Sequence, residues 1–334
     1  MIVCYSATNG TIERQELSPT ATLPKGAVWV DLHNPTAEEQ GAVGKALSLE
    51  LPTLDEMREI EPSSRLYQES GASFMTATAI SKSDDPNPVS DAVTFVLTPR
   101  SLVTIRYVDP KPISTFANRL IRQGGPCGSS EDMLLGLLEA FVDRMADILE
   151  RVSLDLDHLS RSIFDERIST ARRRLGGRRD LRVVLRSLGR NDDINTVVRE
   201  SLLSISRLLR FHAQTMDAGG PAERVLRDQQ RTRIKTLDRD ILSLAEHSGF
   251  EAHKVNFLLD ATLGMINIEQ NNTIKIFSVV AVVFLPPTLI ASIYGMNFHN
   301  MPELDWGLGY PFAIVLMVVA AILPYLYFKR RGWL

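Results

Sequence analysis

The chain is poor in cysteine and lacks a recognisable signal peptide, two features typical of secreted proteins. Only Cys4 and Cys127 are cysteines among its 334 residues, and neither lies beside a histidine cluster. Two widely spaced cysteines predict neither a disulfide framework nor a zinc site, which fits a reducing compartment. The N-terminal segment MIVCYSATNG lacks the basic and apolar regions of a signal peptide. We therefore expect the bulk of the chain in the cytoplasm.

Motifs of ATP-driven or enzymatic chemistry are also missing. The segment GGPCGSS at 124–130 has glycines but lacks the lysine of a phosphate-binding loop. No His, Asp and Ser arrangement of nucleophilic catalysis stands out, and the spacing of His247 and His253 does not place them on one helical face as metal ligands. We predict a protein that is not an enzyme and needs no cofactor.

A strong excess of one charge is absent, since the formal net charge is −3. The Arg-rich segment 172–182 has no interleaved aromatic residues and is balanced by acidic residues around it. This pattern favours a solvated helical face over a nucleic-acid site, so we expect no nucleic-acid partner.

Charged residues are missing from two long runs near the C-terminus, 276–298 and 309–328. At 1.5 Å per residue, about 20 residues cross a hydrocarbon core of roughly 30 Å. A pair of buried core helices is the alternative, but such helices seldom lack charge over this length. We predict two transmembrane helices, the first over 276–298 and the second over 309–328.

The charges beside these runs predict their orientation. The loop 299–308 contains Glu303 and Asp305 but no Lys or Arg, whereas the tail 329–334 begins with Lys-Arg-Arg. The positive-inside rule places the loop outside and the tail in the cytoplasm. We therefore expect a multi-pass protein of the cytoplasmic (inner) membrane with both termini in the cytoplasm.

Residues 1–125 are expected to form a small cytoplasmic α/β domain. Thr36 with Glu39, and Thr53 with Glu56, have the spacing of capping boxes that open short helices. Runs of β-branched and aromatic residues predict strands at 27–31, 73–80 and 92–108, the last broken by a hairpin at 98–101.

Residues 126–275 have the apolar spacing of long helices. One is predicted over 133–163 and another over 179–215. No proline occurs between residue 222 and the pair Pro286-Pro287, so a single helix of about 70 residues, roughly 100 Å, can run into the first span. A helix this long must pack against others, in this chain or in identical subunits. We predict a helical stalk.

The first span contains polar residues that a helix facing lipid does not need. Asn271 and Asn272 precede it, Thr288 and Ser292 interrupt it, and Pro286-Pro287 removes two backbone donors. Because two spans cannot enclose a pore, a pore would need several copies of the chain. Each feature taken singly also fits a helix outside a pore, since Ser and Thr can bond back to their own helix.

The sequence around the end of this span resembles the CorA magnesium/cobalt transporter family. The residues that carry the resemblance are YGMNF, then MPELDW and GYP, and last the basic cluster before the terminal Trp-Leu. Gly-Met-Asn at the end of the penultimate helix is that family's signature. The resemblance implies a funnel-shaped homopentamer whose passive pore admits Mg²⁺, and also Co²⁺ and Ni²⁺.

The resemblance also implies roles for individual residues. Neutral amide oxygens at the outer mouth can hold hydrated Mg²⁺, which dehydrates reluctantly, and still release it. An apolar ring further in can close the pore by dewetting, although family members often have Met and Leu at these gate positions. The implied selectivity filter is Gly295, Met296 and Asn297; the implied pore lining is Asn271, Ile274, Phe277 and Thr288, with Ile274 and Phe277 at the gate; Glu303 and Asp305 would attract cations to the entrance.

Regulation in the family uses cytosolic Mg²⁺ that bridges carboxylates of neighbouring subunits and holds the channel shut. Acidic residues of exposed loops are the alternative explanation for such carboxylates. The candidates here are Asp84, Asp85, Asp91, Asp238 and Asp240.

Two other functions remain open at this stage. A zinc transporter of the related ZntB type is disfavoured because Met296 keeps the magnesium form of the triplet and the histidines are scattered. A membrane-anchored coiled-coil scaffold would explain the long helix, but it would not need polar residues and prolines in the first span.

Overall fold

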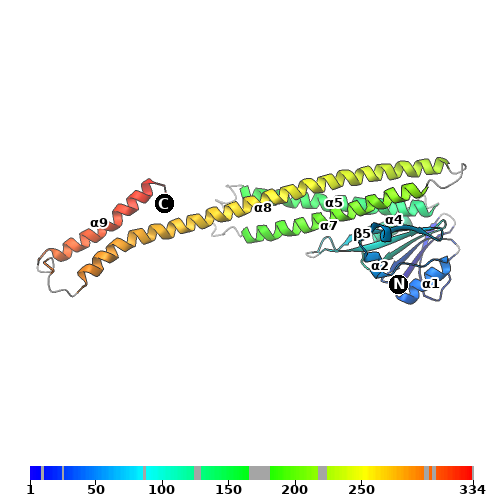
Figure 1. Cartoon of the computed structure of the whole chain (residues 1–334), viewed down its shortest axis with the longest axis horizontal. Coiled ribbons are helices and arrows are strands. Elements are labelled where there is room, and N and C mark those ends of the chain that lie inside the picture. Colours follow the sequence, from blue (N-terminus) through cyan, green and yellow to red (C-terminus); the bar gives the residue numbers. More distant parts are fainter. Residues whose placement is uncertain are drawn as a thin grey trace. The chain divides into compact units, whose positions relative to one another are not determined.

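The computed structural model describes residues 1–8, 11–24, 26–85, 88–123, 129–164, 181–216, 224–296, 301–302 and 306–332. The chain divides into two compact units, Met1–Leu258 and Leu259–Leu334, and each is described by itself (Figure 1). Several residues singled out in the sequence lie outside the described residues, namely most of the Arg-rich segment (172–180), Cys127, Asn297, Glu303 and Asp305.

The first unit contains a seven-stranded sheet with the order β2-β1-β3-β7-β6-β5-β4. Its neighbours pair antiparallel except β3 and β7, which are parallel. The strands are β1 (Ile2–Thr8), β2 (Thr11–Leu17), β3 (Ala27–His33), β4 (Leu66–Glu69), β5 (Ala72–Ser81), β6 (Val89–Leu97) and β7 (Leu102–Arg106). The strands predicted at 27–31, 73–80 and 92–108 correspond to β3, β5 and the β6–β7 pair.

The turn between β6 and β7 confirms the predicted hairpin. The Thr98 amide donates to the Ser101 carbonyl at 3.0 Å, and the Thr98 hydroxyl oxygen accepts from the Ser101 amide at 3.0 Å. A threonine side chain can replace a missing backbone bond in this way at a tight turn.

Short helices flank the sheet, and their ends follow local sequence rules. Both capping boxes are present, at Thr36 before α1 (Ala37–Leu47) and at Thr53 before α2 (Leu54–Arg58). In each, the threonine oxygen and the glutamate three residues later satisfy amides that a helix start leaves unpaired. The remaining short helices are α3 (Pro62–Arg65) and α4 (Lys111–Gln123).

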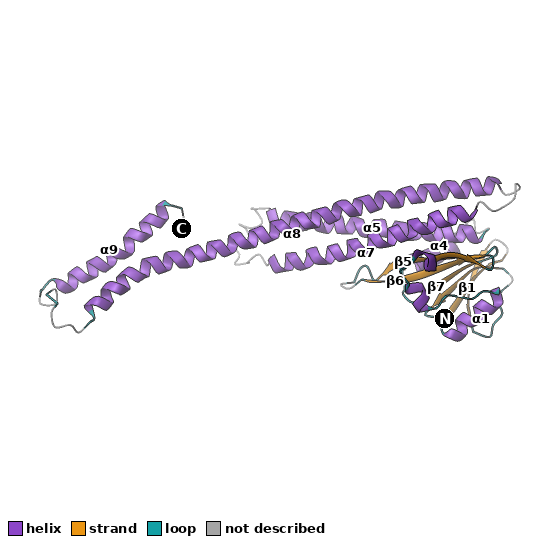
Figure 2. Cartoon of the chain, viewed as in Figure 1, coloured by secondary structure: helices purple, strands orange, loops and turns teal. Residues whose placement is uncertain are grey.

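Three long helices complete the first unit, and two of them pack on the sheet (Figure 2). The Thr78 amide of β5 donates to the Ser204 hydroxyl of α7 (Leu181–Thr215) at 3.0 Å. Phe95 of β6 meets Phe141 of α5 (Ser130–Phe164) edge to face, with ring centroids 6.1 Å apart. The sheet core is therefore sealed by helices predicted from apolar spacing alone.

Helix α8 (Arg224–Tyr294) begins in the first unit beside α5 and α7. It runs antiparallel to α7, because Asn195 donates to the Ser248 carbonyl at 2.9 Å whereas Ser206, later on α7, bonds to Asp238, earlier on α8. It runs parallel to α5, because Lys254 donates to Asp157 at 2.7 Å and, further along both helices, the Phe257 ring stacks on Phe164 with centroids 5.9 Å apart.

The second unit holds the rest of α8 and α9 (Gly309–Arg330). The 71-residue α8 is continuous through Pro286 and Pro287, as the proline-free pattern before them predicted. The most apolar windows of α8 and α9 have mean hydropathies of 2.3 and 2.2, and only 6% of each is buried. A core helix of a soluble protein would be mostly buried, so both helices have the composition and exposure of membrane spans.

Candidate ion pathway

One face of α8 carries the residues predicted to line a pore. At about 100° of rotation per residue, Asn271, Ile274, Phe277 and Thr288 fall within an arc of roughly 120°. All four side chains are exposed, and Ile274 and Phe277 expose 62% and 70% of their surface. The four side chains therefore lie along one face of the helix.

The same face gathers the serine and threonine residues of the predicted first span, 276–298. Ser278 and Ser292 lie seven and twenty-one residues after Asn271, and they fall on the same arc as Thr288. A seven-residue period with small and polar side chains is typical of helices that pack against one another in a membrane. Ser278 was missed in the sequence, although its spacing from Asn271 could have identified it.

Helix α8 continues this face toward its N-terminal side. Asp260 and Asn267 precede Ile274 by fourteen and seven residues, and both are exposed. Asp260 was also missed, because no motif surrounds it and only the period of the long helix assigns it to this face.

The proline pair changes the polar chemistry of the helix without interrupting it. Proline has no N–H, so the Val282 and Val283 carbonyls cannot receive the usual bonds from residues 286 and 287. One turn later the Thr288 hydroxyl donates to the Phe284 carbonyl at 2.7 Å. With its proton so used, the Thr288 oxygen presents only lone pairs, which can accept from water of a hydrated cation.

Gly295 and Met296 lie where α8 ends. The Gly295 amide still reaches the Ala291 carbonyl at 2.9 Å, whereas the Met296 amide turns to Ile293 at 3.2 Å. The bonds thus shorten from four residues to three, which tightens the last turn. A Cβ at position 295 would lie 3.1 Å from the Ala291 oxygen, so glycine suits this exit.

The candidate regulatory carboxylates have different surroundings. Asp84, in the turn after β5, accepts bonds from Lys111 of α4 and from Arg144 and Arg151 of α5. Hydrogen bonding by Lys111, aided by the two arginines, holds the pKa of Asp84 far below its usual range. The backbone carbonyl of Asp85 accepts from Arg190 of α7 at 2.9 Å. This turn therefore joins three helices, α4 and α5 through ion pairs of Asp84 and α7 through a hydrogen bond to the Asp85 carbonyl.

Two further candidates already have cationic partners. Asp91 binds Arg58 through two bonds of 3.1 and 2.6 Å, and the Arg58 bonds lower its pKa. Asp238 accepts from Ser206 and from Arg210, the latter at 3.2 Å. A carboxylate occupied in this way must exchange partners before it can bind a cation.

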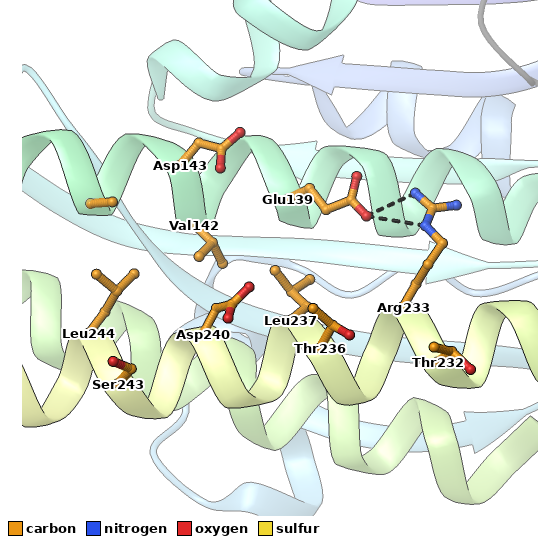
Figure 3. A pocket seen from close by; sticks show the side chains of 11 residues that line it. Glu139, Val142, Asp143, Thr232, Arg233, Thr236, Leu237, Asp240, Ser243 and Leu244 are labelled. Carbon is orange, nitrogen blue, oxygen red and sulfur yellow. Dashed lines mark hydrogen bonds and ion pairs between the residues drawn. The ribbon is translucent and has the colours of Figure 1, made fainter.

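Asp240 lies in a groove of about 590 Å³ between α5 and α8 (Figure 3). Arg233 crosses this groove and pairs with Glu139 at 3.0 Å and with Asp132 at 3.2 Å. Asp240 and Asp143 also line it, and neither forms an ion pair with any residue that the structure describes. Within the described part of one chain, no three His, Cys, Asp or Glu side chains meet as a metal site.

Comparison with known proteins adds what one chain cannot show. The model of the CorA-like Mg²⁺ transporter protein family matches residues 24–330. The chain belongs to this family. The magnesium transport protein CorA of Pectobacterium atrosepticum is 36% identical over 334 residues and covers both chains completely. The CorA protein of Escherichia coli K12 is 35% identical over 342 residues, again covering both chains.

A solved CorA relative confirms the predicted fold class. The complete structure of the CorA magnesium transporter from Methanocaldococcus jannaschii matches with a TM-score of 0.72 over all of this chain and 99% of that one. At 20% identity this match concerns the fold alone. It supports an α/β N-terminal domain, a long helix and two apolar C-terminal helices for this CorA family member.

Proposed function

We propose that the chain is one subunit of a passive channel that admits Mg²⁺ to the cytoplasm. The observation that carries the proposal is that the polar and gate residues share one face of α8, in a chain whose relatives over its full length are magnesium transport proteins. The channel would lie in the cytoplasmic membrane, with both termini in the cytoplasm as the charge asymmetry predicts.

The pore requires several copies of α8 around an axis, and the family resemblance favours five. The period on α8 supports this assembly, because one face repeats from Asp260 to Ser292 and can meet the same face of identical neighbours. In such an assembly, the Phe277 and Ile274 side chains, exposed in a single chain, would form two apolar rings around the pore axis.

Each ring has a distinct task in this proposal. Asn297 holds hydrated Mg²⁺ at the outer mouth, where Glu303 and Asp305 raise the local cation concentration. Gly295 and Met296 position that filter at the end of the helix. Thr288 accepts from the hydration shell, and the Ile274 and Phe277 rings close the pore by dewetting. Asn271 and Asp260 receive the ion at the cytoplasmic end.

Cytosolic Mg²⁺ would control opening by bridging carboxylates of neighbouring subunits. Among the five candidates, Asp85 and Asp240 have no ion pair within the described residues, whereas Asp84, Asp91 and Asp238 already bind basic side chains. Of the two stalk candidates, Asp240 is therefore the one that can share a cytosolic Mg²⁺ with a neighbouring copy without first losing a basic partner. Loss of Mg²⁺ would leave these carboxylates to repel one another and loosen the ring.

The test is Mg²⁺ influx into proteoliposomes with low internal Mg²⁺ and an imposed inside-negative potential. Asn297→Ala should lower influx about tenfold or more, because an amide that binds the hydrated ion contributes on the order of 1–2 kcal/mol. Asn118→Ala, which removes an exposed amide from α4 of the first unit, is the matched control and should leave influx unchanged.

Competition by other ions then ranks the cargo. Inhibition by Co²⁺ or Ni²⁺ supports the wider ion range, whereas Zn²⁺ influx without Mg²⁺ influx would favour a zinc transporter of the ZntB type. Correctly assembled wild-type protein that passes no divalent cation would overturn the channel and favour a membrane-anchored scaffold.

A further inference from the structure

The C-terminal end of α9 carries an unbalanced basic cluster. Lys329, Arg330 and Arg331 are consecutive and exposed. No Asp or Glu occurs between residues 306 and 332, so the helix itself supplies no counter-charge. Within the described part of the chain, no ion pair involves any of the three. The positive-inside rule accounts for the sign of the cluster, but it does not say what neutralises it.

The last turn of α9 fixes where these charges lie. The Arg331 amide donates to the Tyr327 carbonyl at 3.1 Å, and the Gly332 amide donates to the Lys329 carbonyl at 3.2 Å. Gly332 has a φ of 70°, a left-handed conformation that glycine adopts without strain and that often ends a helix. Three consecutive side chains therefore emerge around the end of a capped helix.

Arg331 is further ordered by an aromatic ring. Its guanidinium carbon lies 5.6 Å from the centroid of the Tyr327 ring, one turn earlier on α9. A cation–π contact of this kind uses none of the guanidinium N–H groups as hydrogen-bond donors, so they can donate two parallel bonds to a phosphate. A lysine at this position could not make the same contact.

The distance along α9 places the cluster at the level of lipid phosphates. Lys329 follows Gly309 by twenty residues, which is about 30 Å of helix and matches the hydrocarbon thickness of a bilayer. Immediately before the cluster, Ile322, Leu323 and Leu326 expose 48%, 62% and 46% of their surface. An acyl chain can lie along these side chains while its phosphate reaches the cations.

We propose that Lys329, Arg330 and Arg331, with Tyr327 behind the last, bind the phosphate of an anionic glycerophospholipid in the cytoplasmic leaflet. The proposal rests on α9 spanning the membrane, as in the function proposed above. A free phosphate shares the headgroup chemistry but not the acyl chains, so the exposed apolar side chains beside the cluster favour the lipid.

The test measures lipids retained by the full chain purified in detergent. Native mass spectrometry counts phosphatidylglycerol against phosphatidylcholine of the same acyl length. Because each basic residue near an anionic surface contributes about a factor of five, K329Q/R330Q/R331Q should bind phosphatidylglycerol about a hundredfold more weakly. The control K45Q/K235Q/R239Q removes the same charge from exposed positions of the first unit and should retain it.

A second variant covers the case in which the triple variant fails to insert. Arg331→Gln keeps Lys329 and Arg330, which still orient α9 in the membrane, and should weaken phosphatidylglycerol binding about fivefold. Unchanged retention by these variants, assembled as the wild type, would overturn the proposal. Displacement of phosphatidylglycerol by millimolar inorganic phosphate would assign the site to a free anion instead. Mg²⁺ influx is measured separately, so loss of lipid binding and loss of transport are distinguishable.

Discussion

A buried ion pair in the sheet allows the sharpest test of how the first unit is stabilised. Asp31 of β3 and Arg106 of β7 expose 3% and 6% of their side chains. Arg106 donates to both carboxylate oxygens of Asp31, at 2.9 to 3.2 Å, and the Thr104 hydroxyl adds a bond of 2.6 Å. Asp31 lies opposite Thr104 in the parallel register, so the contact follows directly from strand pairing.

Asp31→Asn keeps the shape of this site but leaves Arg106 without its buried counter-charge. Two unit charges about 4 Å apart attract by about 4 kcal/mol at an effective dielectric of about 20. Removing one partner of a buried pair typically costs about 3–5 kcal/mol. With a urea slope of about 3 kcal/mol per molar for a unit of this size, the unfolding midpoint should fall by about 1 M.

The matched control is Asp109→Asn, which removes the other carboxylate bound to Arg106. Asp109 pairs with the same arginine at 2.6 Å, but its side chain is 70% exposed. An exposed pair contributes only about 0–1 kcal/mol, so this midpoint should move by less than about 0.3 M.

The assay is urea unfolding of the full chain in detergent, followed by fluorescence of Trp29. Trp29 is fully buried and its indole donates to Thr104 at 3.0 Å, so it reports on this network. Trp306→Phe and Trp333→Phe remove the other two tryptophans. Equal midpoints for Asp31→Asn and Asp109→Asn would refute the reasoning that burial decides the contribution of each pair.

Three further predictions follow from single side chains. His212 is 1% exposed, and burial lowers its pKa to about 4, so the imidazole binds a proton less readily in the folded state than in the unfolded state. The free energy of unfolding should therefore fall by about 2 kcal/mol between pH 7 and pH 5. The same change of pH should lower it much less in His212→Gln. Gly136→Ala should destabilise by about 1–3 kcal/mol in thermal unfolding because its Cβ would lie 2.7 Å from the Phe116 ring, whereas Gly189→Ala, with open space around it, should stabilise by up to about 1 kcal/mol. Thr288→Val should lower Mg²⁺ influx severalfold in proteoliposomes while Thr273→Val, which removes a similar hydroxyl-to-carbonyl bond, should not; equal effects would remove Thr288 from the pathway.

Much of the fold could be read from local patterns. The capping boxes at Thr36 and Thr53, the hairpin at 98–101 and the continuity of α8 into the first span were all predicted. These features depend on residues a few positions apart or on the period of one helix, so a single stretch of sequence contains their cause. Strands β1, β2 and β4 and helix α4 were not predicted individually, because their short segments lack so clear a pattern.

The candidate site divides in the same way. The α8 face that is proposed to line a pore follows from helical spacing, which also assigns Ser278 and Asp260 to that face once the helix is known to be continuous. The regulatory carboxylates were chosen for charge alone, and sequence gave no reason to separate Asp84 from Asp240. Three basic side chains surround Asp84, whereas no ion pair reaches Asp240 within the described residues.

The sequence by itself determined the two spans, their orientation as a prediction, and the face of α8 that can line a pore. Only the tertiary structure decided which charges are already paired, such as Asp31 with Arg106 and Asp84 with Arg144. The physical reason is range: helical period and hydropathy act over a few residues, whereas these pairs join residues 75 and 60 positions apart. Their partners depend on strand register and helix packing, which no local pattern contains.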